Sequence, residues 1–221
     1  MSAHDRAARR ASRRAALDGT GPTRDQPPAN PGAIGAFALL GEVLLAGIIV
    51  TVLSIPIVTI PAALAAGIRH VRRFVRAEGS PMSALWRDAL RALPGGVVTG
   101  IVVAALAAVL AVDILLAGSG GLPGGEAIAA AGWAIAALAG GALLLASAAW
   151  SPESGWLNAV RSIPGAVQAD PVGALYTVTA AAFVGVAAWM LVPLAVPALG
   201  CAVLAAVAIP SRRRGAVVAD G

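Results

Sequence analysis

The sequence predicts an all-α protein, a polytopic bundle of transmembrane helices. Of its 221 residues, 58% are hydrophobic and only 12% are charged, and the mean hydropathy is +0.83. The apolar residues form long blocks separated by arginine clusters, a pattern typical of integral membrane proteins. A third observation is an internal repeat, because WRDALRALPGGV at residues 86–97 returns as WLNAVRSIPGAV at residues 156–167. We expect about six membrane segments, arranged as three hairpins, and two cytoplasmic amphipathic helices.

Each copy of the repeat is predicted to be a short helix of its own, within residues 80–97 and 151–167. A Ser-Pro pair precedes each copy, which suits a capping serine and a proline at the first helical position, and Pro-Gly near its end predicts a stop. In the first copy, apolar and polar residues separate onto two faces, so the helix should lie flat at the membrane surface. The predicted apolar face holds Met82, Leu85, Trp86, Ala89, Leu90 and Leu93, and the polar face holds Ser83, Arg87, Asp88 and Arg91.

Three regions follow from composition. Residues 1–33 carry arginine, aspartate, proline and glycine without apolar periodicity, which predicts a disordered cytoplasmic tail rather than an export signal. Residues 34–210 form the transmembrane domain with its internal repeat, and residues 211–221 form a short basic cytoplasmic tail.

The first apolar block, residues 34–68, is too long for one straight span. As a helix it would measure ~52 Å against ~30 Å of hydrocarbon. Pro56 and Pro61 interrupt it, and arginines flank it on both sides, so we expect a hairpin with a short, basic returning arm. The last block, residues 173–209, is broken by Pro193 and Pro197 and is also expected to fold back.

Residues 95–117 and 126–150 are each long enough to cross once. With all arginine clusters on the cytoplasmic side of the cell membrane, both termini are predicted to be cytoplasmic. A five-segment version, in which the first block crosses only once, is the main alternative.

Small residues recur at every fourth position of the first of these spans. They are Gly96, Gly100, Ala104 and Ala108. Such a stripe would let another helix approach closely.

The Ser-Ile-Pro-Ile-Val-Thr-Ile run at residues 54–60, followed by a basic segment and the first repeat helix, resembles the signature of the YesL-like family of bacterial integral membrane proteins. Pro56, Val58 and Thr59 carry the resemblance, whereas Pro61 stands where the family usually has glycine. The resemblance implies a multi-spanning protein that is often encoded near carbohydrate-uptake systems and has no established activity.

Two carboxylates lie inside apolar blocks, where a charge is costly. For Asp113, near the end of its span, we expect interfacial solvation. For Glu42 two readings stay open, namely pairing with an arginine of residues 69–76 or lining a polar path. His70 and the single cysteine, Cys201, suggest no site by their spacing.

No arrangement of side chains offers a nucleophile with a base or a set of metal ligands, so we expect no enzyme and no cofactor. The preferred function is an accessory or regulatory membrane protein that docks through the two amphipathic helices. A transporter or permease component and a structural protein resting on the lipid surface are the alternatives. Expected partners are the bilayer with its anionic headgroups and other membrane proteins such as an uptake system, but not nucleic acid. The docking residues would be Trp86, Asp88, Arg91 and Pro94, with their counterparts Trp156, Asn158, Arg161 and Pro164.

Overall fold

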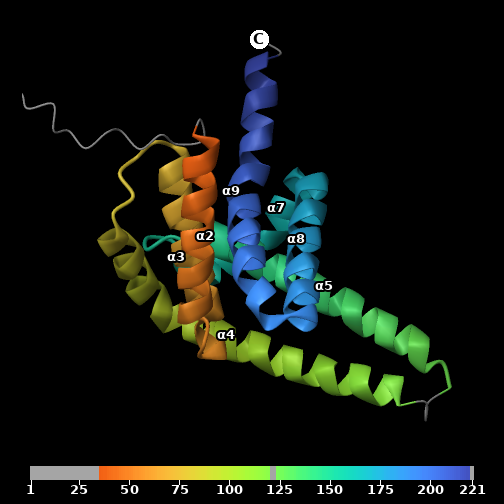
Figure 1. Cartoon of the computed structure of the whole chain (residues 1–221). Coiled ribbons are helices and arrows are strands. Elements are labelled where there is room, and N and C mark those ends of the chain that lie inside the picture. The colour runs from red at the N-terminus through yellow and green to blue at the C-terminus, as the bar shows by residue number, and fades with distance from the viewer. Residues whose placement is uncertain (1–34, 120–122, 220–221) are drawn as a thin grey trace, which may run out of the picture.

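The computed structural model describes residues 35–119 and 123–219, and nearly all of them are helical (Figure 1). No strand occurs in these two ranges, so the predicted all-α class is confirmed. The predicted tail of residues 1–33 lies outside them. The helices are α2 (Ala36–Leu53), η2 (Ile57–Thr59), α3 (Ile60–Val75), α4 (Met82–Gly118), α5 (Gly125–Ala149), α6 (Gly155–Arg161), α7 (Ile163–Ala169), α8 (Pro171–Met190), η3 (Val192–Leu194) and α9 (Ala195–Ala219).

Five helical segments of the described chain are long and apolar enough to cross a membrane: α2, α4, α5, α8 and the stretch Val192–Pro210 that contains most of α9. The chain is therefore a multi-pass membrane protein. The remaining long helix, α3, has only 16 residues and carries arginines in its last turn. Five is the number of segments in the five-segment alternative, and α3 is the short returning arm of the first block.

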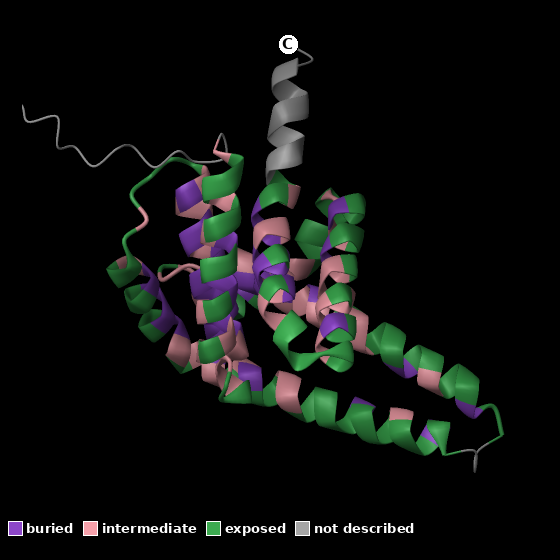
Figure 2. Cartoon of the chain, in the orientation of Figure 1, coloured by how far each residue is buried: buried purple, intermediate pink, exposed green. Residues whose placement is uncertain are grey.

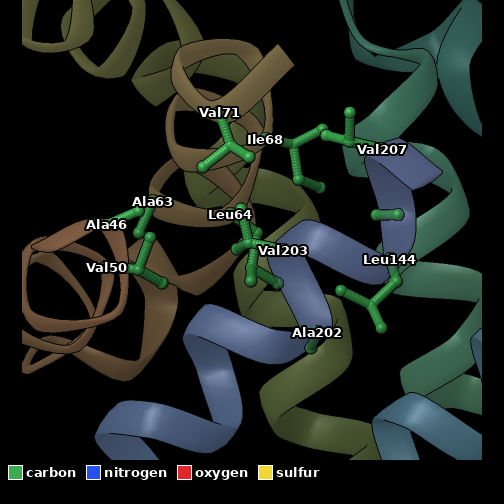
Figure 3. Close-up of a cluster of buried hydrophobic side chains, with 11 residues drawn as sticks. Ala46, Val50, Ala63, Leu64, Ile68, Val71, Leu144, Ala202, Val203 and Val207 are labelled. Atoms are coloured by element: carbon green, nitrogen blue, oxygen red, sulfur yellow. The ribbon is translucent and has the colours of Figure 1, made fainter. Parts of the chain in front are cut away.

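Helix α3 forms the centre of the bundle. Small residues fill its first half, so neighbouring helices approach it closely from several sides, and eleven of its residues are buried. Figure 3 shows the resulting core, in which Leu64 and Ile68 of α3 meet Val50 of α2, Val203 of α9 and Leu144 of α5.

The two predicted turns at prolines are confirmed. Pro56 precedes η2, and Pro61 lies in the first turn of α3, where proline is tolerated because that N–H has no helical partner. Pro193 lies in η3 between α8 and α9. As a result α2 begins, α3 ends, α8 begins and α9 ends at the same end of the bundle (Figure 1).

The last helix runs further than predicted. Helix α9 continues through Pro210 to Ala219, into the stretch expected to be a short tail. The segment that is long and apolar enough to cross a membrane ends at Pro210, inside this helix.

The α4–α5 hairpin projects from the side of the other long helices (Figure 1). Its outer half is mostly exposed (Figure 2) and carries large apolar side chains, which suits contact with lipid tails. These side chains include Ile101, Val102, Leu106, Val109, Val112, Leu115, Leu116, Ile128 and Ile135.

The predicted close contact along the small-residue stripe of α4 is found for only half of the stripe. Gly96 and Gly100 are buried, Ala104 is half-buried and Ala108 is exposed. A Cβ at Gly100 would overlap the carbonyl oxygen of Val58, so the close neighbour there is the turn before α3 rather than another spanning helix.

The prediction that each repeat copy forms a separate, stopped helix is wrong for the first copy. Helix α4 passes through Pro94 and continues to Gly118. Proline removes one backbone bond, whereas a helix that ended in apolar surroundings would leave several backbone groups unpaired. The second copy does break at Ser162, between α6 and α7, with Pro164 in the first turn of α7.

The predicted starts of the repeat helices also need correction. Pro81 is the N-cap of α4 and not its first helical residue, and α6 begins only at Gly155, after a turn. Neither helix has a side-chain hydrogen bond at its N-cap.

The first repeat helix packs one side against α3 and leaves its other side exposed. It runs antiparallel to α3, with Asp88 against the arginines of α3, Gly96 against Ala62 and Gly100 against Val58. The predicted faces are therefore rotated, because Asp88 is buried, whereas Trp86 and Leu90 of the predicted apolar face are exposed.

Candidate functional site: the polar turn of α3 and the paired repeat helices

One turn of α3, residues 69–73, gathers most of the polar contacts within the bundle. We call it the α3 polar turn. Asp88 of α4 accepts hydrogen bonds at Oδ2 from Arg73 Nη1 (2.8 Å) and Arg69 Nε (3.1 Å). The Asp88 side chain is only 7% exposed, and those of Arg69 and Arg73 are 26% and 19% exposed. Two positive groups thus share one buried carboxylate.

A second pair lies on another side of the same turn. His70 is 1% exposed, and its Nε2 lies 2.5 Å from Oε1 of Glu42 on α2. Its other ring nitrogen, Nδ1, is buried and has no hydrogen-bond partner within the described residues. Glu42 is therefore paired, as one reading expected, but with a histidine and not with an arginine.

The polar turn also reaches α5. Arg72 Nη2 donates to the carbonyl oxygen of Ala148 (2.9 Å), and the guanidinium of Arg69 lies over the ring of Trp150, 5.8 Å from its centroid. Cation–π contacts of this kind are favourable when the cation is partly desolvated. The turn therefore connects α3 to α2, α4 and α5 at one level of the bundle.

The two copies of the repeat meet directly. The Trp156 indole of α6 lies against Gly95 and Gly96 of α4, where a Cβ on Gly95 would stand 2.6 Å from its Cδ1. Its Nε1 donates to the carbonyl oxygen of Ala92 (2.8 Å), and its ring lies 6.1 Å from that of Trp150. We call residues 86–97 of α4 and 156–161 of α6 the paired repeat helices.

The two tryptophans of the repeat are not equivalent. Trp156 is 7% exposed, whereas Trp86 is 47% exposed. The likeness of the two copies does not predict this difference. The pair of glycines that admits the indole, Gly95 and Gly96, is complete only in the first copy, because the second has Gly165 and Ala166 at these positions.

Most of the predicted docking residues point outward. Asp88 and Trp156 are the exceptions, since one is held by arginines and the other by α4. Trp86, Arg91, Pro94, Asn158, Arg161 and Pro164 are exposed.

The turn before α6 is electrostatically linked to this surface. The hydrogen bond from Ser151 lowers the pKa of the Glu153 carboxyl, with smaller contributions from the backbone and from Arg69 and Arg91. Glu153 is exposed, so solvent screens these interactions.

The residues of the family resemblance build the turn between α2 and α3. Thr59 Oγ1 donates to the carbonyl oxygen of Pro56 (2.6 Å) and to that of Leu53. The backbone of Val58 lies under Gly100 of α4. These residues therefore have a local structural role, as a compact turn on which α4 packs.

Asp113 lies apart from both features. It is exposed on the projecting part of α4. His70, which the spacing of residues did not single out, is the functional candidate that sequence reasoning missed. The only signal was its place among arginines on a helix with small residues, which predicts burial of the helix but not the partner.

No family model, curated protein or solved structure matches this chain. Within the described ranges, no three His, Cys, Asp or Glu side chains lie close enough together to hold a metal ion.

Proposed function

We propose that this multi-pass membrane protein is an accessory or regulatory component, and that the paired repeat helices are its docking surface for another membrane protein. The observation that supports the proposal most is the contact between the copies. Because Trp156 is inserted beside Gly95 and Gly96, the two helices form one continuous surface and not two separate attachments.

The composition of this surface suits protein recognition. Leu90 and Leu157 are 65% and 73% exposed, and Arg91 and Arg161 are exposed beside them. Exposed apolar side chains next to arginines are typical of protein interfaces, in which arginine is enriched. The partner surface would be apolar with acidic residues. The resemblance to the YesL-like family makes a carbohydrate-uptake system the first partner to test.

Co-purification from mild detergent tests the proposal. Arg91→Glu and Arg161→Glu should each reduce recovery of the partner, because a reversed charge would face the acidic residues that the arginine bound. Glu126→Arg, a charge reversal at an exposed residue at the start of α5 and outside the paired repeat helices, is the matched control and should leave recovery unchanged.

Equal recovery with all three variants would refute docking through these helices. Weaker binding to anionic vesicles with unchanged partner recovery would instead show that the helices contact lipid headgroups only, as in a structural protein of the membrane surface.

The second candidate is a proton-coupled transporter, and the Glu42–His70 pair favours it. Carboxylate and histidine pairs within membrane-spanning helices are typical parts of proton pathways, and His70 Nδ1 lacks a partner in the described chain. Proton flux into vesicles that contain the purified protein is the test. Flux that is abolished by Glu42→Gln would support transport, and flux equal to that of empty vesicles would exclude a proton pathway through this pair.

A further inference from the structure

A cleft beside the end of α3 is separate from the paired repeat helices. Its volume is about 460 Å³, and α3, α5, α7 and α9 line it. Arg72 and Arg76 are its charged residues, and Val75, Leu145 and Val207 are among its apolar ones.

The two arginines differ in how firmly they are held. Arg72 is positioned by its bond to the Ala148 carbonyl oxygen. The Arg76 side chain is 50% exposed and lies 3.9 Å from Glu78, which is 52% exposed. An ion pair this open contributes little and can be exchanged for a stronger anion.

A second cavity of about 290 Å³, lined in part by α8, lies next to the cleft, and Leu145, Ala148, Ala166 and Pro210 line both. Most of its wall is apolar. Asp170 belongs to this second wall only, where its Oδ1 accepts the Gly173 N–H at the start of α8. Positive charge therefore lies in the cleft, and a mostly apolar wall with the single carboxylate of Asp170 lines the second cavity.

We propose that this cavity binds one anionic phospholipid, with the phosphate at Arg72 and Arg76 and an acyl chain along the wall formed by α5, α8 and α9. Charge complementarity places the phosphate, because basic pockets between membrane helices bind anionic headgroups. A lipid is chosen over a free phosphate ion because the second cavity adds apolar wall that an inorganic ion would leave unfilled.

The test measures the thermal unfolding midpoint of the full chain in detergent. Phosphatidylglycerol should raise the midpoint, whereas phosphatidylcholine and inorganic phosphate at the same concentration should not. Native mass spectrometry of the same samples should show one retained phosphatidylglycerol.

Two variants at exposed positions test the arginine end of the site and the junction between the two cavities without disturbing the core. Arg76→Gln should reduce the phosphatidylglycerol effect by half or more, because it removes one of two phosphate ligands. Ala166→Trp should reduce it as well, because an indole at the junction of the two cavities would block the acyl chain. Arg87→Gln, at an exposed arginine of α4 outside the cavity, should keep the full effect.

Three results would overturn the proposal. Equal stabilisation by phosphatidylcholine would mean that detergent replacement and not recognition raises the midpoint. Equal stabilisation by inorganic phosphate would assign the arginines to a soluble anion. Equal losses with Arg76→Gln and Arg87→Gln would show that only net charge matters.

Discussion

Replacing Asp88 with Asn tests whether the α3 polar turn holds α3 against α4. Asn keeps the shape of the side chain but removes the charge that Arg69 and Arg73 share at 3.1 Å and 2.8 Å. The uncompensated charge would be most costly at Arg73, because its Nε and Nη2 are buried and already lack partners among the described residues.

The expected loss of stability in Asp88→Asn depends on how deeply the ion pair is buried. Removing one partner of a fully buried ion pair destabilises by about 3–5 kcal/mol. The Arg69 and Arg73 side chains are 26% and 19% exposed, so solvent screens part of the uncompensated charge. We therefore expect a loss of about 2–3 kcal/mol in the free energy of unfolding. That is roughly a 30- to 150-fold change in the unfolding equilibrium.

Unfolding of the purified protein by sodium dodecyl sulfate, followed by circular dichroism, measures this loss. Glu153→Gln is the matched control, since it removes the charge of an exposed carboxyl group outside the buried pair. A double-mutant cycle with Arg73→Gln should give a coupling energy of about 1–3 kcal/mol. If Asp88→Asn and Glu153→Gln shift the transition equally, or the coupling energy is zero, the buried pair does not hold the two helices together.

Three further predictions concern the packing of α4 and the topology. Gly100→Leu should destabilise the protein by about 3 kcal/mol or more, and Val103→Leu by less than about 1.5 kcal/mol. The reason is that only the glycine lies against backbone that is too close for a side chain. Equal unfolding midpoints for the two variants would contradict this. Trp156→Phe removes a buried indole donor and should lower the free energy of unfolding by about 1–2 kcal/mol. Trp86→Phe, at the exposed equivalent position, should lower it by less than about 0.5 kcal/mol. Similar losses would mean that the two copies are equivalent. In a cysteine-free background, Ser119→Cys at the end of α4 should react with a membrane-impermeant maleimide in intact cells, and labelling only after lysis would place that end of the hairpin in the cytoplasm.

Much of the architecture could be predicted from the sequence, because a bilayer makes simple demands on a chain. A spanning helix must be long and apolar, and a block that is too long must fold back. The prolines at 56 and 193 accordingly mark real turns. Exposure of Arg91 and Arg161 was predictable for the same reason, since an unpaired arginine avoids apolar surroundings.

The tertiary structure alone decided how the repeat is used. Helical periodicity predicted Asp88 on the polar face, but the arginines of α3 make its buried position favourable. The residue pattern within one helix does not indicate which charges lie on another helix. For the same reason the Glu42–His70 pair could not be predicted, because its members are 28 residues apart and lie on different helices.

The two repeat copies show most clearly which features are local to the sequence and which depend on tertiary packing. Composition and periodicity are local properties of the chain, and they were enough to predict that both copies are helical with exposed basic residues. Only the fold decided that α4 runs on through Pro94 while the second copy breaks at Ser162, and that Trp156 is buried while Trp86 is exposed. The physical reason is that burial depends on what packs opposite a residue, and here the glycines of one copy receive the indole of the other.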